Sequence, residues 1–254
     1  MSRVDRAIGL VRSIATYHAI PFRQRRLRRL YGHFVRPGDL VFDIGAHAGN
    51  RVRALASLRC HVVAVEPQPA FASLLRTAFG RSSRVEIVEA AVAAESGTAR
   101  LAVSDRTPTV STLAGAWREA RRRDEGFAHV RWNREIEVTT TTLDALIARF
   151  GLPAFVKIDV EGAEPVVLGG LTHAVQTISF EYLSEALDEV HACTERLAAL
   201  GTYQFNWVAG ESSRLARDRW IDREELLTCL GEADARGHGD VYARLSEQVP
   251  DIRS

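Results

Sequence analysis

Residues 40–68 constrain the fold more than any other stretch of the chain. An apolar run, Leu-Val-Phe-Asp-Ile, contains Asp43 and is followed by a loop with Gly45 and Gly49. A helical stretch comes next, and then a second apolar run, His-Val-Val-Ala-Val, which ends at Glu66. This order predicts a β-loop-α-β unit, in which glycines let the backbone approach a ligand and the helix N-terminus offers free N–H groups.

The glycine spacing indicates which ligand this unit binds. A dinucleotide-binding loop has the pattern G-x-G-x-x-G, where helix N–H groups hold a pyrophosphate. Here the second of three close glycines is absent, and Asp43 stands before the loop, where its carboxylate would repel a pyrophosphate and attract an ammonium group. Glu66 ends the second strand, where a carboxylate suits a ribose diol. S-adenosylmethionine (SAM) has a ribose, an α-ammonium group and no phosphate, so the unit favours SAM. A βαβ unit without a ligand would not explain two carboxylates at adjacent strand ends.

Length and composition fit one α/β domain. The chain has 254 residues, of which 46% are hydrophobic and 26% are charged, as in ordinary globular proteins. No apolar run approaches the roughly 20 residues that span a bilayer, and the N-terminus lacks the features of a signal peptide. Cys60, Cys193 and Cys229 are far apart and odd in number, so we expect neither a disulfide framework nor a zinc site. We therefore expect a cytoplasmic protein.

The net charge of +1 is distributed unevenly. The first 30 residues carry eight arginines against a single acidic residue, Asp5. We expect a basic helical extension at 1–36 and a catalytic domain at 37–254. The basic face is either solvated or a surface for an anionic partner, including peripheral contact with a membrane. Nucleic acid is not an expected partner, because the chain resembles no known nucleic-acid module and aromatic residues make up only 7%.

Alternating strand and helix patterns predict a mostly parallel sheet with helices on both faces. Ligands in such sheets bind at the carboxyl ends of the strands, so Asp43, Glu66, Glu89 and Asp159 are expected to point into one crevice. Residues 104–133 are expected to form a long irregular segment. Strands are expected at 40–44, 61–66, 84–88, 98–103, 135–140, 155–160, 177–183, 203–208 and 240–245, and helices at 50–58, 68–79, 142–150, 163–172 and 185–200, with one or two more before residue 35.

A second motif, Phe-Val-Lys-Ile-Asp-Val-Glu-Gly-Ala-Glu, occupies residues 155–164. Alternation along the strand places Lys157 and Asp159 on the same face, where each could satisfy the charge of the other. Lys157 is the only lysine in the chain. The alternatives are a pair that reaches the crevice and takes part in chemistry, and an ion pair with a structural role alone.

Both motifs resemble the FkbM family of class I SAM-dependent methyltransferases. The similar segments are Val-Phe-Asp-Ile-Gly-Ala-His-Ala-Gly, Val-Glu-Pro-Gln and Val-Lys-Ile-Asp-Val-Glu-Gly-Ala-Glu, within residues 38–185. The resemblance implies a Rossmann-like fold with a seven-stranded, mostly parallel sheet and one antiparallel edge. It also implies methylation of a hydroxyl on a small-molecule acceptor: a sugar, a glycolipid or another natural product. His47 stands where the family usually has asparagine, and Asn50 is the candidate to replace the contacts of that asparagine.

The site residues expected on this basis fall into two groups. Methyl transfer to oxygen needs close alignment of two atoms and a base for the hydroxyl proton, for which Asp159, Glu161 and Glu181 are candidates, while Lys157 could stabilise the alkoxide or hold a carboxylate. No metal is expected, although three carboxylates could alternatively hold Mg²⁺ or Ca²⁺. The expected catalytic residues are Lys157, Asp159 and Glu181, and the expected cofactor-binding residues are Asp43, Gly45, His47, Gly49, Asn50, Glu66, Pro67, Glu89, Ala90 and Asp159.

Two other functions compete with an O-methyltransferase. A nicotinamide-dependent oxidoreductase is disfavoured by the missing G-x-G-x-x-G pattern. A non-catalytic protein that binds SAM or a nucleotide is disfavoured by Lys157, Asp159 and Glu181, which binding alone would not require.

Overall fold

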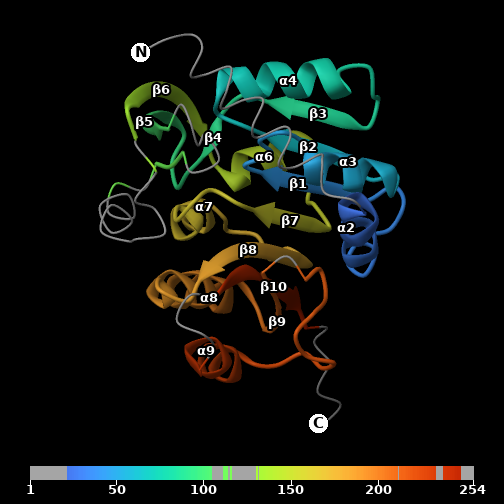
Figure 1. The fold of residues 1–254 in the computed structure, drawn as a ribbon, viewed down its shortest axis with the longest axis vertical. Coiled ribbons are helices and arrows are strands. Elements are labelled where there is room, and N and C mark those ends of the chain that lie inside the picture. Colours follow the sequence, from blue (N-terminus) through green and yellow to red (C-terminus); the bar gives the residue numbers. More distant parts are fainter. Residues whose placement is uncertain are drawn as a thin grey trace.

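The strands of the main sheet form one row in the order β3-β2-β1-β7-β8-β10-β9 (Figure 1). The computed structural model describes residues 22–104, 111–113, 115, 130, 132–210, 212–232 and 237–246. The strands of this sheet are β1 (Leu40–Ile44), β2 (His61–Val65), β3 (Val85–Val88), β7 (Phe155–Ile158), β8 (Thr177–Leu183), β9 (Tyr203–Ala209) and β10 (His238–Leu245).

The strand order places a ligand site at the carboxyl ends of β1 and β7. Successive strands run outward from β1 through β2 to β3, and the chain then resumes on the other side of β1 with β7 and β8. The two directions meet between β1 and β7, which is where open α/β sheets bind ligands. All pairings from β3 to β8 are parallel.

The antiparallel strand is β10, and it does not lie at the edge of the sheet as expected. β10 pairs antiparallel with both β8 and β9, so the edge strand β9 runs in the same direction as β8. The reason is the strand order: β10 follows β9 and α9 (Arg223–Glu232) in the sequence but lies between β8 and β9 in the sheet. The helix α9 was not predicted from the sequence.

Two sets of helices cover the two faces of the sheet. One face packs against α6 (Leu143–Phe150), α7 (Glu164–Gly169), α8 (Leu187–Leu200) and α9, and the other against α2 (Arg23–Tyr31), α3 (Asn50–Ser57) and α4 (Pro69–Phe79). Alternation along β1 explains the division, because Phe42 faces the first set and Val41 faces the second. The near-continuous apolar runs of β1 and β2 suit strands buried on both faces.

A small second sheet was not predicted as a separate unit. It consists of β4 (Ala91–Val92), β6 (Arg134–Thr141) and β5 (Gly97–Val103), in that order. The apolar-polar alternation correctly predicted strands at 98–103 and 135–140, but alternation does not reveal which sheet a strand joins. In Figure 1 this sheet lies to the left of the main sheet, on the side toward which the arrows of the parallel strands point.

Helix α2 is part of the packed core, although its sequence is rich in arginine. Leu30 and Tyr31 are buried on the α3 side, while Arg25, Arg26 and Arg28 point to solvent. The expected helix before residue 22 lies outside the described residues. Among the described helices, none is long and apolar enough to cross a membrane.

Lys157 is completely buried, and its partner is not the one expected. Its Nζ lies 2.9 Å from Asp240 Oδ1 and donates a hydrogen bond of 2.7 Å to the carbonyl of Ile158. Asp159, the expected partner, lies just beyond the end of β7 and pairs with Arg51 instead. The pairing of Lys157 with Asp159 was therefore wrong: insertion of β10 beside β8 brings Asp240 to the lysine.

This pair predicts a large effect on stability. Lys157→Met should lower the free energy of unfolding by roughly 3–5 kcal/mol, because it leaves Asp240 without its partner and removes one of the two cations near the buried Asp43. Urea unfolding measures the loss, with the exposed Arg81→Met as the matched control. A loss no larger than that of the control would show that the ion pair does not stabilise the fold.

Candidate active site

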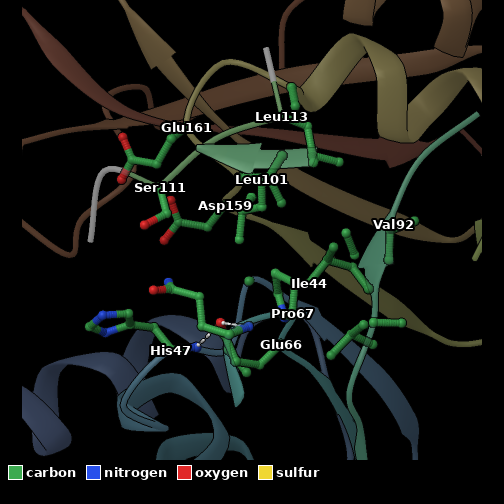
Figure 2. A pocket seen from close by; sticks show the side chains of 18 of the residues that line it. Ile44, His47, Glu66, Pro67, Val92, Leu101, Ser111, Leu113, Asp159 and Glu161 are labelled. Atoms are coloured by element: carbon green, nitrogen blue, oxygen red, sulfur yellow. Dashed lines mark hydrogen bonds between the residues drawn. The ribbon is translucent and has the colours of Figure 1, made fainter. Parts of the chain in front are cut away.

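The main pocket opens at the carboxyl ends of β1, β2 and β7 (Figure 2). It holds about 830 Å³ of empty space, including its open mouth, which is within the range for small-molecule sites. Glu66 and His47 lie on one side of it, and Asp159, Glu161 and Ser111 lie on the other. Of the residues expected to bind a cofactor, the pocket is lined by Gly45, His47, Asn50, Glu66, Pro67, Ala90 and Asp159.

Gly45 allows the loop after β1 to touch the loop after β7. Its φ is +83°, and a Cβ on it would lie 1.9 Å from the carbonyl oxygen of Asp159. The Gly45 N–H donates to the carbonyl of Val65 at 2.9 Å, which fixes the loop against the end of β2. A glycine is therefore required for the close contact that shapes the floor of the pocket.

Gly49 has a different role from the one expected. It does not line the main pocket but precedes α3 with a φ of +77°. A Cβ here would lie 2.6 Å from the Phe79 ring and 2.8 Å from the Leu75 side chain. This glycine permits α3 and α4 to pack together, so its placement among the cofactor contacts is corrected.

The Glu66 carboxylate organises the backbone of the pocket. It is 2% exposed and accepts hydrogen bonds from the backbone N–H groups of His47 at 2.9 Å and Gln68 at 2.8 Å. Burial raises the pKa of Glu66 to about 7, against the lowering effect of these two hydrogen bonds. The Gln68 side chain adds a third hydrogen bond to this carboxylate, which leaves one of its roughly four lone-pair sites for a ligand hydroxyl.

His47 contributes packing and a backbone donor to the pocket. Its φ is +45°, and its ring lies 3.8 Å from the Phe71 ring between centroids. Burial lowers the pKa of His47 to about 4, so the ring is neutral near pH 7 and is a weak proton acceptor.

Asp43 and Glu89 do not reach the main pocket, contrary to the expectation that all four strand-end carboxylates share one crevice. Asp43 is completely buried in the sheet beside Lys157, and neither carboxylate oxygen has a hydrogen-bond partner among the described residues. Burial raises the pKa of Asp43 to about 6, partly offset by Arg51 and Lys157. Glu89 is instead paired with Arg76 at 2.7 Å on the surface.

Arg51 and Asp159 form an ion pair in the wall of the main pocket. The Arg51 Nη1 lies 2.5 Å from Asp159 Oδ2. Burial alone would raise the pKa of Asp159, but Arg51 and Lys157 hold it below the ordinary value, so this carboxylate stays ionised. The pair presents a cation and an anion to the same part of the pocket.

Three carboxylates gather where the loop after β7 meets the end of β8. Oxygens of Asp159, Glu161 and Glu181 lie within 4.8 Å of one another. Burial and the neighbouring carboxylates raise the pKa of Glu161 and of Glu181 well above the ordinary value. The cluster can therefore hold or accept a proton near neutral pH, and its oxygens are also of the type that binds Mg²⁺.

Some important residues were missed by sequence reasoning. Arg51 follows the glycine loop and, taken from the sequence, is one arginine among many. Asp240 lies more than 80 positions from Lys157, and no local pattern connects the two. Lys157 and Glu181, which were expected to be catalytic, do not line the main pocket: Lys157 lies beneath it and Glu181 lies beside it.

Comparison with known proteins identifies the family by its sequence. The model of the methyltransferase FkbM domain matches residues 43–201. The 31-O-demethyl-FK506 methyltransferase FkbM of Streptomyces tacrolimicus is 28% identical over 215 residues, which cover 73% of this chain and 80% of that protein. Among solved structures, an O-methyltransferase from Bacillus cereus in complex with SAH has a TM-score of 0.45 at 12% identity, covering 97% of this chain and 92% of that one. A TehB-like SAM-dependent methyltransferase from Corynebacterium glutamicum has a TM-score of 0.46 at 10% identity, covering 92% and 93%.

The buried Glu66 predicts a pH-dependent stability. Its pKa rises from 4.5 to about 7 on folding, so the folded state binds the proton more tightly and its stability falls as pH rises through that window. Glu66→Gln cannot ionise. The free energy of unfolding of the wild type, relative to this variant, should fall by roughly 3 kcal/mol between about pH 4 and pH 8.

Urea unfolding across this pH range measures the difference. Glu86→Gln on the exposed side of β3 is the control and should track the wild type. A Glu66→Gln variant whose difference from the wild type does not change with pH would contradict the raised pKa.

Proposed function

Because this chain belongs to the FkbM family of SAM-dependent methyltransferases, we propose that it methylates a hydroxyl oxygen of a small sugar, glycolipid or other natural product. The Streptomyces tacrolimicus relative is named as a methyltransferase of 31-O-demethyl-FK506, which supports oxygen as the acceptor atom. The observation that carries the proposal is the cluster of Asp159, Glu161 and Glu181 beside the main pocket, because a hydroxyl must lose a proton as it is methylated. The family disfavours the two alternatives, a nicotinamide-dependent oxidoreductase and a non-catalytic binding protein.

In the proposed complex, the main pocket holds SAM. Glu66 accepts a hydrogen bond from the ribose diol at the lone-pair site that its bonds to His47 and Gln68 leave over. The apolar side chains of Val92, Leu101 and Leu113, which line the same pocket, provide a surface for the adenine ring. The ion pair of Arg51 and Asp159 offers both charge signs to the zwitterionic methionine end.

The proposed chemistry is an in-line displacement at the SAM methyl group. SAM supplies an activated methyl group, and the protein aligns the acceptor oxygen with it. Arg51 keeps Asp159 ionised, so this carboxylate provides a fixed negative charge. Glu181 has a raised pKa and can take up the hydroxyl proton. Lys157 is buried under the site and acts as a positioning residue through Asp240.

The role of Glu66 predicts weaker cofactor binding in Glu66→Gln. The variant should bind SAM roughly 1–3 kcal/mol more weakly near pH 8, because a charge-assisted hydrogen bond to the ribose becomes a neutral one. Calorimetric titration measures the affinity, and the exposed Glu86→Gln should bind as the wild type does. Unchanged SAM affinity in Glu66→Gln would remove Glu66 from the ribose site.

The function itself is tested with SAM carrying a ¹³C-labelled methyl group and a panel of hydroxylated sugars and macrolides. We expect formation of S-adenosylhomocysteine together with a product whose labelled carbon is a methoxy group by NMR. Label on nitrogen or carbon in the product would contradict O-methylation.

With an acceptor from that panel, Glu181→Gln should lower turnover by a factor on the order of 10² and leave SAM affinity unchanged, because it removes the proton acceptor. Turnover should rise with pH as the cluster loses its proton. Added chelator should not change the rate. A chelator-sensitive rate that Mg²⁺ restores would instead assign the cluster to a metal ion.

A further inference from the structure

A second hollow lies next to the main pocket, between α2 and the carboxyl ends of β8 and β9. It holds about 540 Å³ of empty space, including its opening. Leu27 and Leu30 of α2 form one wall, and Glu181 and Asp240 lie across from them. Asn50 and Arg51 line both this hollow and the main pocket, so the two spaces are adjacent.

We propose that the second hollow binds the methyl acceptor, an inference that rests on the proposed function. A hydroxyl bound there would lie beside Glu181, whose carboxylate is within 4.8 Å of those of Asp159 and Glu161 in the wall of the main pocket. The methyl group of SAM would approach from the main pocket and the acceptor oxygen from the second hollow, with Arg51 at the junction. The proton then passes from the hydroxyl to Glu181 as the new C–O bond forms and the C–S bond of SAM breaks.

The main pocket and the second hollow differ in how much of their lining lies in the segment that the family model matches. Every described residue that lines the main pocket falls within the matched segment, 43–201. Of the twelve described residues that line the second hollow, nine fall outside it, in α2 and in the segment from β9 to β10. The cofactor site therefore lies in the part of the chain that the family model matches, and the acceptor site is built mostly from segments outside that part.

Helix α2 is held over the junction between the two spaces. The Gln24 side-chain amide donates to the backbone carbonyl of Asn50 at 3.1 Å and also to its side-chain oxygen. Tyr31 at the other end of α2 is buried in the core. A wall fixed at both ends gives the hollow a defined shape, which suits selection among acceptors.

The lining indicates an uncharged, polyhydroxylated acceptor about the size of a monosaccharide. The charged side chains of the lining are two of each sign, namely Arg23, Arg51, Glu181 and Asp240. Arg51 and Asp240 are already paired with Asp159 and Lys157, so the hollow has no excess of one charge. Carboxylate oxygens accept hydrogen bonds from hydroxyls, while Leu27 and Leu30 contact the C–H face of a ring.

The test uses the full chain saturated with S-adenosylhomocysteine and three probes: the methyl pyranosides of glucose, mannose and rhamnose. Saturation-transfer NMR and calorimetric titration should detect binding of at least one probe. Leu27→Trp and Ser213→Trp, from opposite walls of the hollow, should each weaken that probe by about tenfold or more, equivalent to roughly 1.4 kcal/mol. S-adenosylhomocysteine affinity should stay within about twofold of the wild type, and Leu152→Trp, at an exposed leucine elsewhere, should change neither.

The outcomes separate this proposal from the proposed function. Binding of none of the three probes, or equal binding by the wild type and Ser213→Trp, would overturn the second hollow as a site for such acceptors. If Leu27→Trp does not fold, Ser213→Trp decides, because Ser213 lies in an irregular segment rather than in a helix. Failure of the wild type to bind S-adenosylhomocysteine at all would instead contradict the methyltransferase function.

Discussion

The buried ion pair between Lys157 and Asp240 is the interaction on which the carboxyl edge of the sheet depends. It joins β7 to β10, the strand that enters last between two neighbours. Asp43 of β1 is buried beside Lys157, its partner in the pairing with β7. Asp159 comes two residues after Lys157, just beyond the end of β7. Burying several carboxylates at this edge of the sheet is costly unless cations lie beside them, and Lys157 and Arg51 are those cations.

One of these cations, Arg51, lies where two spaces at this edge meet. Arg51 lines both the main pocket and the second hollow and keeps Asp159 ionised between them. Burial and mutual repulsion raise the pKa of Glu161 and Glu181. Asp159 therefore stays ionised, whereas Glu161 and Glu181 can exchange a proton. A methyl transfer to a hydroxyl requires such a difference between neighbouring carboxylates.

Sequence patterns predicted the sheet well and the site in part. The runs that became β1 and β8 were bounded correctly, and Glu66 was placed in the pocket, because strand alternation and strand ends are local properties. The depth of a side chain is not local, so Asp43 was expected in the crevice although it lies beneath it. The partner of Lys157 was missed for a related reason: it depends on the strand order, which places Asp240 beside it. The expected boundary at residue 36 stays a prediction.

A crystal structure of the complex with S-adenosylhomocysteine would test whether the carboxyl edge holds a cofactor space and a separate acceptor space. We expect the ribose hydroxyls within hydrogen-bond distance of Glu66, the amino-acid end beside Arg51 and Asp159, and the sulfur facing the second hollow. Ribose bound away from Glu66, or S-adenosylhomocysteine occupying the second hollow, would contradict both the cofactor site and the division of the edge into two spaces.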